Sequence, residues 1–272
     1  MDYSSLCAHI RQTASYLCVG LDTEPGRLPA GFAKTPEAML AFNEAIIAAT
    51  HTYCVAYKIN TAFYEALGTA GWECLKQTCQ MIPPGKLRIL DAKRGDIGNT
   101  AQAYARAFFE ELGADALTLS PYMGHDSIQP FLEYPGKWVV LLALTSNPGH
   151  ADFQLLRLAN GRYLFEEVLL QAQNWADPSR LMFVVGATQS KWLETVRQLA
   201  PDNFLLVPGV GAQGGDLAQV SKLGLNPQGG LLVNASRSIL YASSGEDYVE
   251  AARQAAQAIQ LEMKGQLRAF PA

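Results

Sequence analysis

Eight short apolar runs recur along the chain, each separated from the next by a longer segment with a helical pattern. They occupy residues 16–21, 54–59, 87–91, 116–120, 138–144, 181–186, 204–207 and 230–233. The runs are continuously apolar rather than alternating, which is typical of parallel strands that are covered on both faces. Eight alternating strand and helix units in 272 residues predict an α/β fold, the (β/α)8 TIM barrel, with an open doubly wound sheet as the alternative.

The segments between the runs carry helix signals. The clearest is 36–50, where Thr35 can cap the N-terminus, Pro36 suits the first turn and apolar residues repeat on one face. The longest irregular stretch, 145–161, follows the fifth run and should lie on the active face of a barrel. No linker or change of composition divides the chain, so we expect one domain over residues 1–272. The other expected helices are 61–81, 100–112, 162–175, 190–199, 215–222 and 247–268.

Composition argues against several classes of function. Only 17% of the residues are charged, the net charge is -4 and no Lys/Arg cluster is interleaved with aromatics, so nucleic acid is not an expected partner. No run approaches 18 apolar residues and no signal-peptide pattern is present, so we expect a cytoplasmic protein without membrane contact. The five cysteines form no CxxC pair and the four histidines show no ligand spacing. We therefore expect buried reduced thiols and no metal.

The third apolar run ends in a cluster of charge. In a strand over residues 87–91, side chains alternate faces, so Asp91 and Lys93 should point the same way. Gly95 allows the chain to turn and present Asp96. A carboxylate two residues from an ammonium favours both charged forms. A solvated loop with a surface ion pair is the plainer interpretation, but the glycine and the helix start that follows favour a site.

Two earlier strand ends add to this cluster. Asp22 follows the first apolar run and Lys58 lies at the end of the second. A lysine that ends an apolar run costs free energy unless it is paired or hydrated. In a barrel, these residues converge with Asp91 and Lys93 on one mouth. Four such charges together indicate a site rather than unrelated rim residues.

Two later loops favour a bound phosphate. The glycine-rich stretch 207–215 follows the seventh run, and 234–238, which contains Arg237, follows the eighth. Barrels commonly bind phosphate at these two loops, through backbone amides and a helix N-terminus. Glycines permit close approach of the backbone, and a guanidinium can hold two oxygens at once.

Three of these segments, 90–97 (Leu-Asp-Ala-Lys-Arg-Gly-Asp-Ile), 208–215 and 237–239, resemble orotidine 5'-phosphate decarboxylases. The similarity runs from residues 20–22 to Tyr241, nearly the whole chain. The long stretch after the fifth run and the motif DAKRGDIGNT resemble the longer bacterial branch, type 2. The resemblance implies a homodimeric barrel with shared active sites that converts orotidine 5'-phosphate to UMP in pyrimidine biosynthesis without a cofactor.

The resemblance also implies roles for the charged cluster. Lys93 resembles the proton donor to C6 of the pyrimidine, and Asp91 would lie beside the departing carboxylate. Lys58 would pair with the aspartates and hold the ribose, whose hydroxyls Asp22 would also bind. The chemistry agrees with this assignment: loss of CO2 leaves a carbanion that no ring carbonyl is well placed to delocalise, so a fixed ammonium must stabilise and then protonate it.

The remaining roles implied by the resemblance lie around this centre. Asp96 and Thr100 resemble residues that reach across the dimer interface into the neighbouring site. Ser146 resembles the residue that reads the pyrimidine edge, whereas Gln213 and Arg237 resemble the phosphate contacts. The loop after the eighth run departs from the shorter family members, which carry a glycine before the arginine.

Three other functions remain open at this point, two enzymatic and one non-catalytic. A related barrel decarboxylase that acts on a keto-sugar phosphate would share the Asp-x-Lys-x-x-Asp motif, but it would need acidic or histidine ligands for a metal. A strand-end lysine with a lowered pKa could instead form the Schiff base of an aldolase. The chain could also be a catalytically silent phosphate-binding barrel.

Overall fold

The computed structural model describes residues 1–210 and 215–270 and shows a closed barrel of eight parallel strands in sequence order. The closing pair is formed by the first and last strands, where Leu17 lies opposite Val233. The predicted barrel is therefore confirmed and the open sheet is wrong. Each predicted apolar run overlaps one strand. The strands are β1 (Leu17–Gly20), β2 (Ala56–Asn60), β3 (Leu87–Arg94), β4 (Ala116–Leu119), β5 (Trp138–Leu144), β6 (Leu181–Val185), β7 (Phe204–Pro208) and β8 (Leu231–Ala235).

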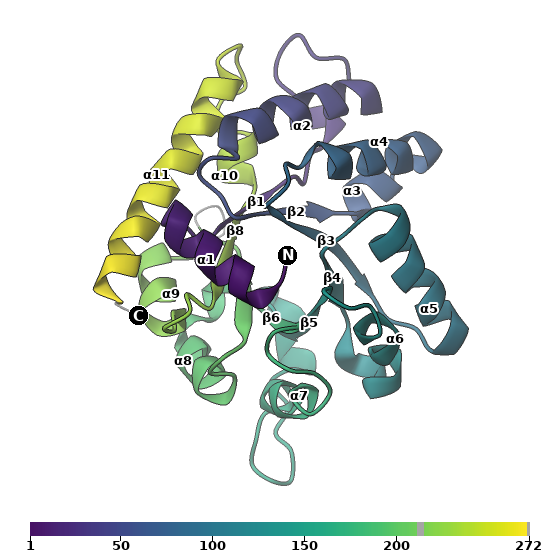
Figure 1. The fold of residues 1–272 in the computed structure, drawn as a ribbon, viewed down its shortest axis with the longest axis vertical. Coiled ribbons are helices and arrows are strands. Elements are labelled where there is room, and N and C mark those ends of the chain that lie inside the picture. Colours follow the sequence, from purple (N-terminus) through teal and green to yellow (C-terminus); the bar gives the residue numbers. More distant parts are fainter. Residues whose placement is uncertain (211–214, 271–272) are drawn as a thin grey trace.

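Helices surround the barrel as an outer ring (Figure 1). The prediction for α2 is confirmed in detail, because Thr35 accepts a hydrogen bond from the Ala38 amide and Pro36 occupies the first turn. The α-helices described are α1 (Tyr3–Thr13), α2 (Pro36–Thr50), α3 (Ala62–Glu65), α4 (Gly68–Met81), α5 (Gly98–Arg106), α6 (Gln129–Leu132), α7 (Leu164–Ala172), α8 (Ser190–Leu199), α9 (Leu217–Gly224), α10 (Arg237–Leu240) and α11 (Tyr248–Ala269).

Two predicted helices are divided in the structure. The helix expected at 61–81 breaks between α3 and α4, where Gly68 has a φ of +66°. The two pieces pack closely, since a Cβ at Gly71 would lie 1.9 Å from the Tyr64 carbonyl oxygen. The helix expected at 100–112 begins earlier, at Gly98, and ends in a wider π-helical turn over Ala107–Glu111.

Two other helix boundaries move because of capping. The helix expected at 215–222 begins at Leu217, because the Asp216 carboxylate accepts hydrogen bonds from the amides of Ala218 and Gln219. The helix expected at 162–175 shortens to α7, whose first turn is closed by Glu166 accepting from the Tyr163 amide.

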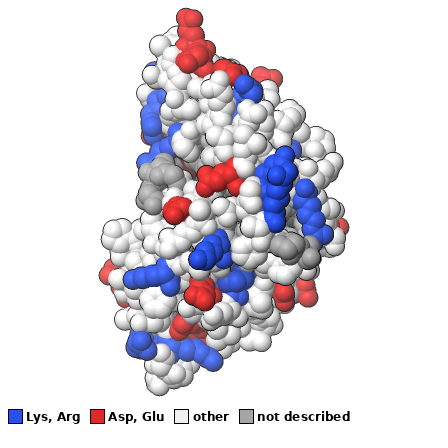
Figure 2. Space-filling view, turned by 90° about the vertical axis from the view of Figure 1, so that its left-hand side faces the viewer, with Lys and Arg blue, Asp and Glu red and all other residues white. Residues whose placement is uncertain are grey.

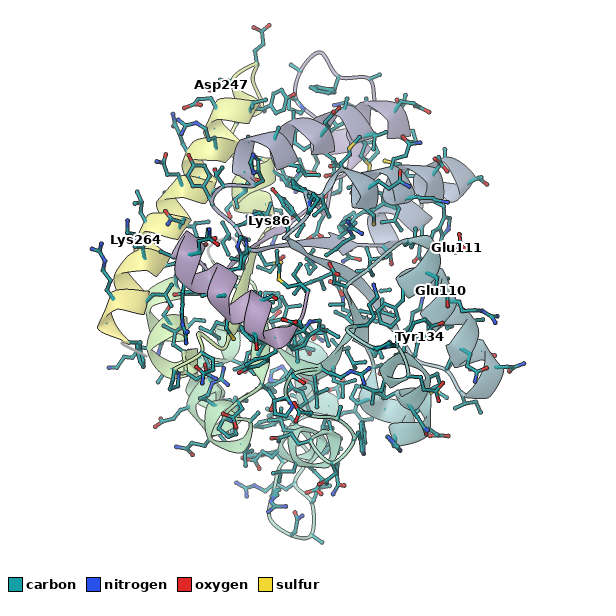
Figure 3. All side chains as sticks on the ribbon, viewed as in Figure 1. Lys86, Glu110, Glu111, Tyr134, Asp247 and Lys264 are labelled. Carbon is teal, nitrogen blue, oxygen red and sulfur yellow. The ribbon has the colours of Figure 1, made fainter. Side chains whose placement is uncertain are left out.

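Helix α1, which was not predicted, covers the N-terminal end of the barrel. Its Tyr3 ring packs against Trp138 and Phe204, the first residues of β5 and β7. Beside α1, Lys86 (labelled in Figure 3) donates hydrogen bonds to the Cys54 carbonyl at 2.7 Å and to His9 Nε2 at 3.1 Å. This end is therefore closed by packing, and the opposite end is left for a site.

Outside the barrel, the surface carries charges of both signs. On the face shown in Figure 2, Lys and Arg side chains are interspersed with Asp and Glu. The five cysteines are buried and unpaired, as predicted. Among the helices of residues 1–210 and 215–270, none is long and apolar enough to cross a membrane.

Candidate active site

A cavity of about 300 Å³ opens at the C-terminal ends of the strands. Residues in or directly after all eight strands contribute to its lining. Its lining combines apolar side chains, with Leu142, Val184 and Leu206 from β5, β6 and β7, and several charged residues. A concave site that combines apolar side chains with a few convergent polar groups is suited to a small organic ligand.

Four charged side chains form a continuous row at one side of the cavity. Lys58 Nζ lies 3.0 Å from Asp22 Oδ1 and 3.1 Å from Asp91 Oδ2. Lys93 Nζ lies 2.6 Å from Asp91 Oδ1. Lys58 is only 4% exposed, whereas the Lys93 side chain is 48% exposed and reaches into the cavity. The structure thus brings together the four residues that the sequence placed at strand ends.

Lys58 and Asp91, the two central residues of the row, each favour the charged form of the other. Burial alone would raise the pKa of Asp91, but the ammoniums of Lys58 and Lys93 offset this and hold that pKa well below its usual range. Burial alone would lower the pKa of Lys58, yet Asp22 and Asp91 raise it above the ordinary lysine value. The buried ammonium of Lys58 and the carboxylate of Asp91 therefore stay charged because their neighbours in the row compensate for burial.

An irregularity in the pairing of β3 with β4 sets the orientation of the Lys93 side chain toward Asp91. Leu90 pairs with Leu117 of β4, whereas Arg94 pairs with Leu119, so β3 advances by four positions where β4 advances by two. Lys93 itself has a φ of +49°, in the left-handed region. Simple strand alternation is therefore the wrong reason for its contact with Asp91. A bulge places the two side chains together.

Thr118 secures this bulge and was missed in the sequence. Its hydroxyl accepts a hydrogen bond from the Lys93 amide at 2.9 Å and donates one to Asp91 Oδ1 at 2.9 Å. One side chain thus holds both the backbone of the lysine and the carboxylate beside it. The available signal was a threonine between Leu117 and Leu119 in the fourth run.

The predicted phosphate residues that the structure describes line the cavity after β8, the strand that pairs with β1. Arg237 lines the cavity at the start of α10, and no carboxylate of residues 1–210 and 215–270 forms an ion pair with it. Two nearby oxygens, Asn234 Oδ1 and Ser236 Oγ, are buried without a hydrogen-bond partner in the described parts of the chain. Gln213 lies outside the described residues. The Arg237 guanidinium and the Ser236 hydroxyl can donate hydrogen bonds to an anion, whereas the Asn234 oxygen can only accept.

The remaining predicted residues divide into two groups. Ser146 lines the cavity directly after β5, together with Asn147. Asp96 and Thr100 do not line it, as far as residues 1–210 and 215–270 define its wall. Asp96 accepts a hydrogen bond from the Ile97 amide at 2.8 Å, and Thr100 is exposed on α5. One chain alone therefore does not bring these two residues to its own charged row.

The polar groups do not form a metal-binding cluster in the part of the chain that the structure describes. No three His, Cys, Asp or Glu side chains gather there in an arrangement that could hold a metal ion. What the residues offer is an ammonium fixed beside a carboxylate, and an arginine that lines the same cavity without an ion-pair partner among the described residues. Such a cavity can bind a small molecule by an anionic end and place its other end against Lys93.

Comparison with known proteins agrees with this arrangement. The family model described as "Orotidine 5'-phosphate decarboxylase / HUMPS family" matches residues 15–255. The orotidine 5'-phosphate decarboxylase of Bacteroides fragilis is 52% identical over 273 residues, which cover 99% of this chain and 100% of the relative. That of Porphyromonas gingivalis is 53% identical over 272 residues, with 99% of each chain covered. The solved structure of Leishmania donovani OMP decarboxylase has a TM-score of 0.85 and 40% identity, and 98% of each chain is covered. This chain therefore belongs to the orotidine 5'-phosphate decarboxylase / HUMPS family.

Proposed function

We propose that the chain converts orotidine 5'-phosphate to UMP without a cofactor and that Lys93 delivers the proton to C6. Family membership and the full-length relatives make the chain an orotidine 5'-phosphate decarboxylase, a carboxy-lyase. The observation that supports the residue assignment is the Lys58–Asp91–Lys93 row, which faces the same cavity as Arg237.

The proposed reaction needs a fixed positive charge. When the bond from C6 to the carboxylate breaks, CO2 leaves and the electron pair stays on C6. The Lys93 ammonium stabilises this charge and then transfers a proton to the carbon, which leaves a neutral amine that regains its proton from water. Asp91 holds the ammonium at 2.6 Å, so little reorganisation is needed when the charge develops.

The phosphate end supplies binding energy far from the reacting bond. Arg237 can grip two phosphate oxygens, and the Ser236 hydroxyl, which has no partner in the described residues, can donate to a third. Interactions of this kind anchor the substrate and hold its base against the charged row. Asp22 and Lys58 line the same cavity and, in this proposal, contact the ribose hydroxyls.

We further propose that the chain acts as a homodimer in which Asp96 and Thr100 serve the neighbouring site. Two features of the chain support this. Asp96 lies away from its own cavity, and apolar side chains are exposed on the loops after β3 and β4, with Ile97 51% and Tyr122 83% exposed. Exposed apolar residues of this kind are typical of an interface between subunits.

A subunit-mixing experiment tests the shared site. Inactive Lys93→Ala protomers mixed with inactive Asp96→Ala protomers should form dimers that carry one intact site and one doubly defective site. Random exchange of equal amounts makes about half of the dimers mixed, so about a quarter of the sites should regain activity. If subunits exchange and activity stays at the level of the single variants, Asp96 acts within its own chain.

The function itself is tested by following absorbance as the purified chain consumes orotidine 5'-phosphate. UMP should form, and Lys93→Ala should abolish its formation while the cavity still binds UMP. A chain that leaves this substrate intact but decarboxylates a keto-sugar phosphate with an added divalent ion would overturn the proposal. Trapping of a keto-substrate on Lys93 by borohydride would point instead to an aldolase.

A further inference from the structure

The loop that carries Ser146 exchanges hydrogen bonds with side chains that do not themselves line the cavity. Thr145, Ser146 and Asn147 face the cavity after β5, whereas Gln154 and Gln189 lie outside its lining. Gln189 is only 6% exposed, so its amide must find partners inside the protein. Both hydrogen-bond partners of its Nε2 belong to the loop after β5, the loop that carries Ser146 into the cavity wall.

Gln154 holds the residue before Ser146. Its Oε1 accepts a hydrogen bond from the Thr145 amide at 2.8 Å, and its Nε2 donates to Thr145 Oγ1 at 2.9 Å. The Thr145 hydroxyl in turn donates to Asn147 Oδ1 at 2.6 Å. The residues on both sides of Ser146 are therefore tied to each other and to Gln154.

Gln189, at the end of the 3-10 turn after β6, adds a second tie. Its Nε2 donates to the Thr145 carbonyl at 3.1 Å and to His150 Nε2 at 3.2 Å. His150 Nδ1 lies 2.7 Å from the Asn147 carbonyl, which can only accept, so Nδ1 carries the proton and Nε2 is the acceptor. The amide of Gln189 thus reaches Thr145 directly and Asn147 through His150.

Gly186 provides the surface on which Ser146 rests. A Cβ at this position would lie 2.7 Å from Ser146 Cβ, 2.8 Å from its amide nitrogen and 2.9 Å from its Cα. The backbone of Gly186, with φ -64° and ψ 136°, suits any residue. The glycine is therefore required by the close approach of Ser146 and not by its own conformation.

We propose that Gln189 and Gly186, both following β6, are positioning residues that set the place of Ser146 and so the recognition of the pyrimidine edge. This inference rests on the proposed function. Neither residue touches the ligand, so each acts only through Ser146 and its neighbours. A displacement of this loop changes the binding of the base and leaves the phosphate end of the cavity as it was.

The test compares a ligand that has a base with one that lacks it. Calorimetry with UMP and with ribose 5-phosphate is carried out on the wild type, Gln189→Glu and Gly186→Ala. Gln189→Glu keeps the shape but replaces the donor by an acceptor, so UMP affinity should fall by roughly tenfold, the effect of one misaligned buried hydrogen bond. Affinity for ribose 5-phosphate should not change. Gly26→Ala is the matched control, because nothing lies within 4 Å of its added Cβ.

A double-mutant cycle with Ser146→Ala tests whether the effect passes through Ser146. In the Ser146→Ala background, Gln189→Glu should cause little further loss of UMP affinity. Additive losses, or an equal loss of ribose 5-phosphate affinity, would overturn the positioning role, as would unchanged UMP affinity in both folded variants. A wild type that binds ribose 5-phosphate but not UMP would overturn the proposed function and this inference with it.

Discussion

Replacement of Lys58 by Met should destabilise the fold by about 3–5 kcal/mol at pH 7. Met nearly preserves the volume but leaves the Asp22 and Asp91 carboxylates without the ammonium between them. Lys58 Nζ lies 3.0 Å and 3.1 Å from these two carboxylates. At an effective dielectric constant of about 20, each contact contributes about 5 kcal/mol before desolvation is subtracted. Removal of one partner leaves a buried charge uncompensated, which gives the net figure above.

Lys93→Met is the matched comparison. It removes a shorter contact, 2.6 Å to Asp91, but from a side chain that is 48% exposed. Water screens such a pair, so its loss should cost no more than about 1 kcal/mol. Under the proposed mechanism both variants should lack activity, since Lys93 would donate the proton and Lys58 holds the Asp91 carboxylate that contacts it. The two substitutions should therefore differ in their cost to folding stability but have the same effect on activity.

The effect of Lys58 also has a defined dependence on pH. In the native protein the pKa of Asp91 lies below its usual range, despite burial, because of Lys58 and Lys93. Asp91 therefore contributes stability above its unfolded pKa of about 4, and this stability is lost as pH falls toward the folded pKa. Without Lys58 the pKa of Asp91 rises, so the deficit of Lys58→Met should be largest near neutral pH and shrink below about pH 4.

Urea unfolding of the wild type and the two variants at pH 7 and in acid measures these differences. The expected order at pH 7 is wild type, Lys93→Met and then Lys58→Met, with unchanged slopes. Equal losses for the two lysines would refute the argument from burial. A Lys58→Met deficit that stays constant in acid would refute its assignment to the carboxylates.

Three further predictions follow from other parts of the molecule. Arg237→Ala should weaken substrate binding by about 2–5 kcal/mol, since a charge-assisted contact is lost; unchanged affinity would place the phosphate elsewhere. Activity should survive exhaustive treatment with EDTA, and a loss that a divalent ion restores would contradict the cofactor-free proposal. Burial and Lys86 lower the pKa of His9, so stability should decline as pH falls below about 6.5, where the unfolded chain binds the proton more readily. His9→Gln should remove that part of the slope, and identical pH profiles would count against it.

The barrel was predictable because each of its strands corresponds to a separate apolar run in the sequence. A strand covered on both faces must be apolar throughout, and charges at its end then stand out. Asp22, Lys58, Asp91 and Lys93 were found in this way. Local capping likewise predicted α2, because Thr35 and Pro36 act within one turn of the chain.

Features that depend on a neighbouring element were not predictable in the same way. The bulge that aims Lys93 arises from pairing with β4, and the role of Thr118 appears only once the two strands lie together. The Ser146 loop shows the same limit, since Gln189 reaches it from the turn that follows the adjacent strand β6. Helix α1 is different: Asp2 caps it through the Ser5 amide, so a local signal was present and was overlooked.

The closing pair of strands also determines the order in which the protein can be completed during synthesis. β1 pairs with β8, so one edge of β1 stays open until the last strand has left the ribosome. A nascent chain that ends before residue 231 already contains the charged row but not Arg237, and it exposes unpaired edges on β1 and β7. Such an intermediate is prone to associate with other chains. Residues 231–237 therefore both close the sheet and add Arg237, the proposed phosphate contact, to the cavity, so protection from aggregation and completion of this cavity depend on the same short segment.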